Sequence, residues 1–184
     1  MNFLVYWFPM DYLTEYNPEW PAWFAQIEMY LRARISPLLR IEHVGSTSIV
    51  GMFAKPIIDI DIVVGDGQIL EVVASIERAG YTHRGDLGVI GREAFGPESP
   101  ETITLPPHHL YACEASANAL LIHLSFRDYL RSHPDESELL ANYKRCFINE
   151  EKLSREEYVQ AKSESDLVSR LSERAAAWRI GNDK

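Results

Sequence analysis

Two short runs of polar residues in this chain have types and spacing suited to phosphate and metal chemistry. The first is Gly45 followed by the hydroxyl residues Ser46, Thr47 and Ser48, directly after a predicted strand. Glycine lets the backbone approach a ligand closely, and hydroxyls with free N–H groups at a following helix start suit phosphate oxygens. The second run, Asp59-Ile60-Asp61, places two carboxylates in an otherwise apolar segment.

The Asp59 and Asp61 pair predicts a divalent-cation site. Residues i and i+2 of a strand point to the same face, so both carboxylates project together. Two carboxylates on an apolar strand repel each other and resist burial, and a cation relieves both problems. Mg²⁺ is usually held by one or two carboxylates plus substrate phosphate oxygens. Each run alone has a plainer interpretation, as an ordinary turn or as an acid that pairs with Lys or Arg; together they favour a site for Mg²⁺ or Mn²⁺ and a phosphorylated ligand.

These runs need a sheet to position them. We predict strands over 40–44, 56–64 and 109–113, and two short strands within 81–96. A loop is predicted over 97–107, and a helix over 69–79 that ends at Gly80. Asn17-Pro18-Glu19 predicts a helix start, followed by an apolar stripe from Trp20 to Leu38. The remaining predicted elements are a strand over 3–8 and helices over 116–133, 134–149 and 154–178.

This order of elements predicts an α/β (α+β) fold, a small mixed sheet backed by helices with a C-terminal helical tail. The 184 residues suit one domain over 1–184, with a sheet-containing core over about 16–115 and a tail over about 116–180. Hydrophobic residues make up 46% and charged residues 24%, which is ordinary globular composition.

Composition also narrows the partners and the compartment. The net charge of −9 argues against broad nucleic-acid binding, which needs a basic face. The sequence contains no run of about 20 apolar residues, so we expect no membrane span. Residues 1–8 lack the basic start of a signal peptide. Cys113 and Cys146 have no metal-like spacing, so we expect free thiols in a reducing, cytoplasmic setting.

Longer motifs resemble a known family. The Gly-Ser followed by Asp-x-Asp is similar to the signature of the nucleotidyltransferase superfamily, and residues 43–48 (His-Val-Gly-Ser-Thr-Ser) with residues 54–60 look like the GrpB family. Further matching segments occur in the same order, at 16–21, 91–92, 108–110, 126–131, 133–134, 158 and 162. The resemblance covers residues 16 to 168. It implies a nucleotidyltransferase-like α/β fold with C-terminal helices, and transfer of a nucleoside monophosphate from a triphosphate at an acid-bound Mg²⁺.

The chain departs from the family pattern in several places. Ile49-Val50 replaces a usual Val-Pro, and Tyr111 replaces a usual His. A basic residue usual after the Gly-Arg segment is missing from 93–97. The strand over 109–113 lacks the third carboxylate that superfamily enzymes place there, and Glu114 is the nearest candidate. These departures bear on catalytic competence more than on fold.

We assign roles to the candidate residues as follows. Asp59 and Asp61 hold the metal, with His43 as a third catalytic candidate that accepts a proton. Gly45 and the hydroxyls of residues 46–48 contact phosphate. The cations expected to neutralise phosphate charge are Lys55, Arg92 and Arg127; the residues expected to line the pocket are His108, His109 and Tyr111.

Structural alternatives stand beside these roles. His43 could simply hold the loop by a hydrogen bond. His108 and His109 could form a transition-metal site with Asp59, since imidazole and carboxylate suit Zn²⁺, Mn²⁺ or Fe. Arg127 with Asp128 could be a salt bridge that anchors a helix to the sheet.

Three classes of function follow. The first is a Mg²⁺-dependent nucleotidyltransferase acting on an unknown acceptor, with a nucleoside triphosphate or another phosphorylated small molecule as partner. The second is a catalytically silent nucleotide- or coenzyme A-related binding module. The third is a folding or interaction accessory protein. The aspartate pair favours the first two over the third, and the missing third acid favours the second over the first.

Overall fold

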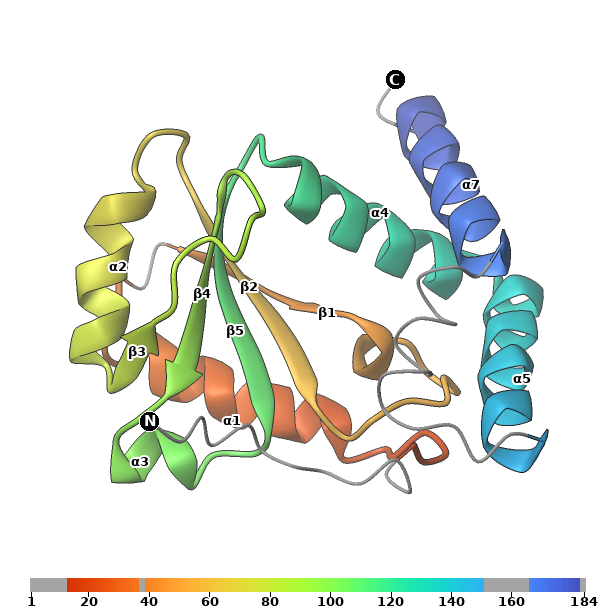
Figure 1. The fold of residues 1–184 in the computed structure, drawn as a ribbon, viewed down its shortest axis with the longest axis horizontal. Coiled ribbons are helices and arrows are strands. Elements are labelled where there is room, and N and C mark those ends of the chain that lie inside the picture. The colour runs from red at the N-terminus through yellow and green to blue at the C-terminus, as the bar shows by residue number, and fades with distance from the viewer. Residues whose placement is uncertain (1–12, 37–38, 151–165, 183–184) are drawn as a thin grey trace.

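The computed structural model describes residues 13–36, 39–150 and 166–182. Its centre is a mixed sheet with the strand order β1-β2-β5-β4-β3 (Figure 1). The central pair β2 and β5 is parallel, whereas the β1–β2, β5–β4 and β4–β3 pairs are antiparallel. The strands are β1 (Arg40–Val44), β2 (Ile58–Val64), β3 (Tyr81–His83), β4 (Arg92–Pro97) and β5 (His108–Glu114).

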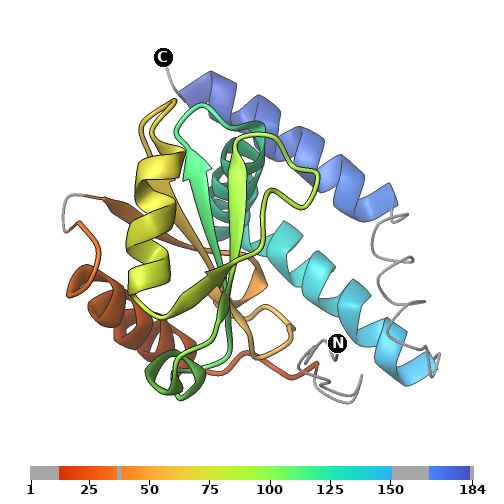
Figure 2. The ribbon, with the colours of Figure 1, turned by 60° about the vertical axis from the view of Figure 1, so that its left-hand side comes forward.

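Helices lie on both sides of this sheet (Figure 2). On one side, α1 (Trp20–Arg32) and α2 (Ile69–Arg78) pack against the sheet through the main apolar core. On the other side, α4 (Asn118–Ser132) contacts the sheet. The helices α5 (Pro134–Glu150) and α7 (Asp166–Asn182) pack against α4 through a second apolar cluster. The mixed α/β fold predicted from the sequence is therefore confirmed.

The alternation along β2 explains why the aspartates face one side. Ile58, Ile60 and Ile62 are fully buried in the core shared with α1 and α2. Because successive side chains alternate between the two faces of a strand, Asp59 and Asp61 point to the other side, toward α4. The apolar face fixes the register, since a slip of one residue would bury the carboxylates in the core and expose the isoleucines.

Two boundaries differ from the sequence prediction. The first helix ends at Arg32, short of the predicted stripe to Leu38, because the backbone tightens there: the amides of Arg34 and Ile35 both bond to the Leu31 carbonyl. The second boundary is the helix start. The Asn17 side chain accepts the Glu19 amide at 2.9 Å, but the helix itself begins three residues after Asn17, at Trp20.

The predicted loop over 97–107 contains a short helix, α3 (Pro100–Ile103). Ser99 caps this helix by accepting the Thr102 amide at 3.2 Å, and Pro100 occupies the first turn, where its missing N–H costs nothing. The prolines that indicated a loop thus include a helix start. The predicted strand over 3–8 and the predicted helix start at 154–157 lie outside the described residues.

Cys113 is buried and Cys146 is exposed, and both are free thiols. Within the described ranges, none of the helices combines the length and the apolar character that a membrane span requires.

The helix α2 offers a matched test of the core. Ile76 is fully buried, whereas Leu70 on the same helix is 73% exposed. We expect Ile76→Ala to lower the free energy of unfolding by about 2–5 kcal/mol through lost burial and the cavity left behind. Leu70→Ala should change it by no more than about 0.5 kcal/mol. Urea denaturation of both variants measures this; equal losses would show that α2 does not pack as described.

Candidate functional site

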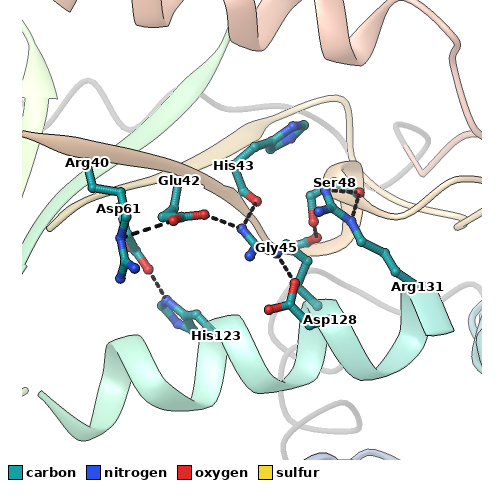
Figure 3. Close-up of polar contacts among 10 residues, drawn as sticks. Arg40, Glu42, His43, Gly45, Ser48, Asp61, His123, Asp128 and Arg131 are labelled. Carbon is teal, nitrogen blue, oxygen red and sulfur yellow. Dashed lines mark hydrogen bonds and ion pairs between the residues drawn. The ribbon is translucent and has the colours of Figure 1, made fainter. Parts of the chain in front are cut away.

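Asp61 is a buried carboxylate with one satisfied and one unsatisfied oxygen. Its side chain is completely buried, and its Oδ2 accepts a 2.7 Å hydrogen bond from Nδ1 of His123 on α4 (Figure 3). Its Oδ1 is buried and has no hydrogen-bond partner in the described part of the chain. A buried carboxylate oxygen without a partner is costly, so this atom marks a place where a ligand could bind.

Asp59 lies on the same face and is held from two sides. Its Oδ1 accepts a 2.9 Å hydrogen bond from Nδ1 of His109, the residue directly opposite on β5. Its Oδ2 lies against Gly45, where an added Cβ would be only 2.1 Å away. Gly45 also has φ of +69°, in the left-handed region. Only glycine allows the loop to approach the carboxylate this closely.

The loop after Gly45 forms a short 3₁₀ helix, η2 (Ser46–Ser48). Ser48 Oγ donates to the Gly45 carbonyl at 2.6 Å, and Thr47 Oγ1 donates to the Ile57 carbonyl at 3.2 Å. Both residues are buried, so their hydroxyls serve the loop itself. Of the three hydroxyls predicted to contact phosphate, the geometry leaves Ser46 as the one available to a ligand.

His43 holds this loop from the opposite face of the sheet. Its ring stacks on Phe24 with a centroid separation of 4.8 Å, and its Nε2 lies 3.0 Å from Thr47 Oγ1. Because Thr47 donates to a carbonyl, His43 Nε2 is the donor in this contact. Burial, reinforced by the nearby Arg131 guanidinium, lowers the pKa of His43 to about 4. These contacts give His43 a positioning role at the loop, and its proton-accepting role stays a prediction.

His108 and His109 are adjacent on β5 and so point to opposite faces. His108 Nδ1 donates to the Pro106 carbonyl at 2.7 Å, and its Nε2 accepts from the Tyr81 hydroxyl at 2.9 Å. Burial lowers the pKa of His108. His108 thus lies with Tyr81 and Pro106 on the sheet face opposite to His109 and Asp59, away from where its predicted pocket role and the alternative metal site would place it.

Three residues spaced by four along α4 face the sheet and the loop (Figure 3). His123 binds Asp61, as described above. Arg127 reaches Glu42 on β1 at 2.5 Å, the His43 carbonyl at 3.1 Å and Asp128 at 2.7 Å. Arg131 donates to the Ser48 carbonyl through two nitrogens, at 2.8 and 3.0 Å. Arg127 therefore anchors the helix to the sheet, the structural alternative to its predicted phosphate role.

Lys144 on α5 reaches the same loop from the other side. Its side chain is buried, and its Nζ donates to Ser46 Oγ at 2.7 Å. The sequence alone does not predict this contact, because nothing in the pattern of α5 indicates which part of the chain its lysine meets. The sequence pattern also assigned no role to His123 or Arg131, although their spacing with Arg127 is a readable signal.

The remaining predicted residues are spread along the sheet. Arg92 on β4 lies with its guanidinium carbon 4.5 Å above the Tyr111 ring, so these two share a face but not the loop. Lys55 lies in the segment between η2 and β2, and its phosphate role stays a prediction. Glu114, the nearest candidate for a third acid, lies at the far end of β5 and accepts the Gly67 amide at 2.9 Å.

The chemistry available here is that of two carboxylates, an imidazole and a cation beside a tight loop. Across the residues that the structure describes, no group of three or more His, Cys, Asp or Glu side chains is arranged to hold a metal ion. Carboxylates could therefore supply only part of a coordination shell. The carboxylate nearest to Asp61 on the neighbouring strand, Glu42, is already paired with Arg40 at 3.1 Å and with Arg127.

The close contact between Gly45 and Asp59 can be tested against a matched glycine. Gly51 has φ of +79°, but an added Cβ there meets nothing within 4 Å. Gly51→Ala should cost about 1–2 kcal/mol from backbone strain alone. Gly45→Ala should cost about 1–3 kcal/mol more, because the methyl group displaces the Asp59 carboxylate. Urea denaturation compares them, and equal losses would show that Asp59 does not contact this glycine.

The buried His43 predicts a pH dependence of stability. The unfolded chain takes up a proton near pH 6.5, whereas the folded chain resists protonation until about pH 4. The folded state therefore loses stability as pH falls from about 6.5 to about 4, by up to about 1.4 kcal/mol per pH unit. In His43→Gln, which keeps a donor for Thr47, the slope of the free energy of unfolding over this window should be smaller. Identical slopes would contradict the assignment.

Comparison with known proteins places the chain among relatives. The family model described as GrpB protein matches residues 12–173. The chain is 33% identical over 173 residues to the UPF0157 protein YqkA of Bacillus subtilis, covering 91% of this chain and 48% of the relative. It is 35% identical over 176 residues to the UPF0157 protein PA4798 of Pseudomonas aeruginosa, covering 88% and 66%. The chain thus spans about half the length of the first relative and 66% of the second.

Solved structures give the fold. The conserved protein GrpB from Enterococcus faecalis superposes with a TM-score of 0.74 at 26% identity, covering 91% of this chain and 99% of that one. The Cid1 poly(U) polymerase, in a structure with MgGTP bound, superposes with a TM-score of 0.52 at 12% identity, covering 72% and 44%. The second likeness shows that the fold is nucleotidyltransferase-like. Together with the family match over most of its length, these comparisons show that the chain belongs to the GrpB family.

Proposed function

We propose that this protein binds a nucleoside triphosphate with Mg²⁺ or Mn²⁺ and transfers the nucleoside monophosphate to an acceptor. One observation carries the proposal: the Asp59 and Asp61 carboxylates share a sheet face with a glycine loop whose serine meets a buried lysine. Anionic and cationic groups arranged in this order suit a metal-bound triphosphate.

The phosphate end of the site is formed by Ser46 and Lys144. The Lys144 side chain is only 6% exposed, and burying an ammonium group is costly unless anions or polar acceptors surround it. A phosphate oxygen at the Ser46 hydroxyl would lie beside this charge. The positive charge of Lys144 acts locally, so it can attract a phosphate although the whole chain has a net charge of −9.

The carboxylate end fits a hard divalent cation. Oxygen donors from one or two carboxylates are the protein ligands that Mg²⁺ usually takes, with water and substrate phosphate completing the shell. The unsatisfied Asp61 Oδ1 and the Asp59 carboxylate are the residues that would hold it. A cation bound there would neutralise the charge on the phosphoryl oxygens and on the leaving pyrophosphate.

The protein's own part in transfer is positioning and proton handling. The acceptor oxygen bonds to the α-phosphorus while the bond from that phosphorus to the β-phosphate oxygen breaks, so pyrophosphate leaves. The proton of the acceptor must pass to a base. The Asp59–His109 pair is the hydrogen-bonded acid–imidazole pair on this face, and we assign it that role.

One observation favours a second candidate, nucleotide binding without turnover. A third carboxylate was expected on the strand over 109–113, and the residue directly opposite Asp59 on that strand is His109. An imidazole does not supply the negative charge of a third acid. A protein with this site could keep the ligand and lack the chemistry.

Calorimetric titration with ATP, CTP, GTP and UTP in Mg²⁺ or Mn²⁺ tests the proposal. We expect metal-dependent heat with at least one triphosphate, and loss of that heat in Asp59→Asn/Asp61→Asn. Pyrophosphate release in the presence of candidate acceptors then separates the two candidates, since the binding module releases none. Folded wild-type protein that binds no triphosphate would overturn both.

The lysine at the loop has a matched control on its own helix. Lys144→Gln should weaken triphosphate binding about 10- to 100-fold, the range of a hydrogen bond to a charged group. Arg145→Gln removes the next charge along α5, which pairs with Glu15 at 2.5 Å, and should leave the affinity within about twofold. Equal weakening by both variants would assign the effect to net charge and not to Ser46.

A further inference from the structure

Arg92 differs from the arginines that hold the fold together. Its Nε is buried and has no hydrogen-bond partner among the described residues. Its guanidinium carbon lies 4.5 Å from the centre of the Tyr111 ring, which supports the group from one side. Arg127 and Arg131, by contrast, donate to carboxylates and carbonyls of the protein.

Arg92 belongs to the same sheet face as the aspartates. Arg92 is opposite Cys113 on β5, two residues beyond Tyr111, and Tyr111 is opposite Asp61. The charges act on shared neighbours: burial and the Asp61 carboxylate raise the pKa of the Cys113 thiol, and the Arg92 guanidinium opposes them. Burial and Asp59 likewise raise the pKa of Tyr111, again against Arg92.

Two buried polar atoms on this face are unsatisfied, and they have opposite character. Asp61 Oδ1 is an acceptor and Arg92 Nε is a donor, and neither has a hydrogen-bond partner in the described ranges. Strand β5 lies between the strands that carry them, so they do not pair directly. The proposed function assigns Asp61 Oδ1 to a cation, which leaves the buried Arg92 Nε as the donor on this face that points to a further ligand, one that carries an acceptor oxygen.

Arg92 lies away from the loop after Gly45 that the proposed function assigns to the triphosphate. The loop contacts Asp59, which is opposite His109, whereas Arg92 is opposite Cys113. His109 and Cys113 are four positions apart along β5, which places their backbones about 13 Å apart at ~3.3 Å per residue. Cationic side chains therefore lie at both ends of the aspartate pair: Lys144 beside the loop that contacts Asp59, and Arg92 over Tyr111, the residue opposite Asp61.

We propose that Arg92, supported by Tyr111, binds an anionic oxygen group of the acceptor substrate, a carboxylate or a phosphate. The term acceptor rests on the proposed nucleotidyl transfer; the anion site itself does not. A planar guanidinium with a free Nε–H presents donors in the fork that matches carboxylate and phosphate oxygens. An uncharged acceptor would leave the buried Nε unpaired, so the site selects against it.

The Nε–H group gives a local readout by NMR. In ¹⁵N-labelled protein, the Arg92 Nε–H signal is assigned by its loss in Arg92→Lys, which keeps the positive charge. Titration with inorganic phosphate and, separately, with acetate should shift this signal and reach saturation. The Arg127 Nε–H, already bonded to Asp128 at 2.7 Å, is the internal control and should not move. The anion that saturates at the lower concentration identifies the group the site prefers.

The outcomes separate this proposal from the proposed function. A saturable Arg92 shift in protein that binds no triphosphate would support the anion site and remove the nucleotidyl transfer. The shift should persist in Lys144→Gln; its loss there would mean that phosphate binds only at the loop, which overturns a separate site. The proposed anion site is also overturned if neither anion shifts the Arg92 signal, as would happen if a fixed water accepted the Nε–H. It is likewise overturned if the Arg92 and Arg127 signals shift together.

Discussion

The burial of Asp61 is the constraint on which the rest of the site depends. A carboxylate that is fully buried on a strand of isoleucines and valines costs several kcal/mol unless another group compensates it. His123 provides that compensation from α4, at 2.7 Å. Removing the imidazole would leave both carboxylate oxygens without a hydrogen-bond partner among the described residues, so the position of α4 over the sheet and the burial of Asp61 are physically linked.

The anchoring of α4 in turn places the C-terminal helices. Arg127 extends the contact of His123 along the same helix face to β1. Arg131 extends it to the loop (Figure 3). Helices α5 and α7 then pack on α4 through Tyr129, Leu130, Leu140 and Leu171. This packing is what brings Lys144, nearly a hundred positions further along the chain, to Ser46. Residues of the loop and of the tail therefore meet because one helix is fixed by polar contacts to the sheet.

The sequence predicts the sheet and the shared face of Asp59 and Asp61, for physical reasons. The isoleucine alternation in 58–62 and the glycines at positions 45 and 80 are local signals, and they predict β2, the tight loop and the end of α2. What the sequence could not predict depends on contacts between distant elements. The face of His43 and of His108 follows from strand register, and the partner of Lys144 follows from how helices dock. Spacing along α4 carries a signal for His123 and Arg131, but it does not reveal which strand each residue meets.

The lack of a third carboxylate on the strand from His109 to Cys113 changes what the site requires of its ligand. A cation bound by Asp59 and Asp61 alone has fewer negative ligands than one bound by three carboxylates, and its affinity for the free protein is correspondingly lower. A triphosphate supplies the missing negative charge, so under the proposed function cation and nucleotide would bind together. The His109 imidazole, which donates to Asp59, holds that carboxylate in place. With Lys144 at one end and Arg92 at the other, the positive charges of the protein flank the aspartates and do not compete for them directly, because β5 and the loop hold them apart.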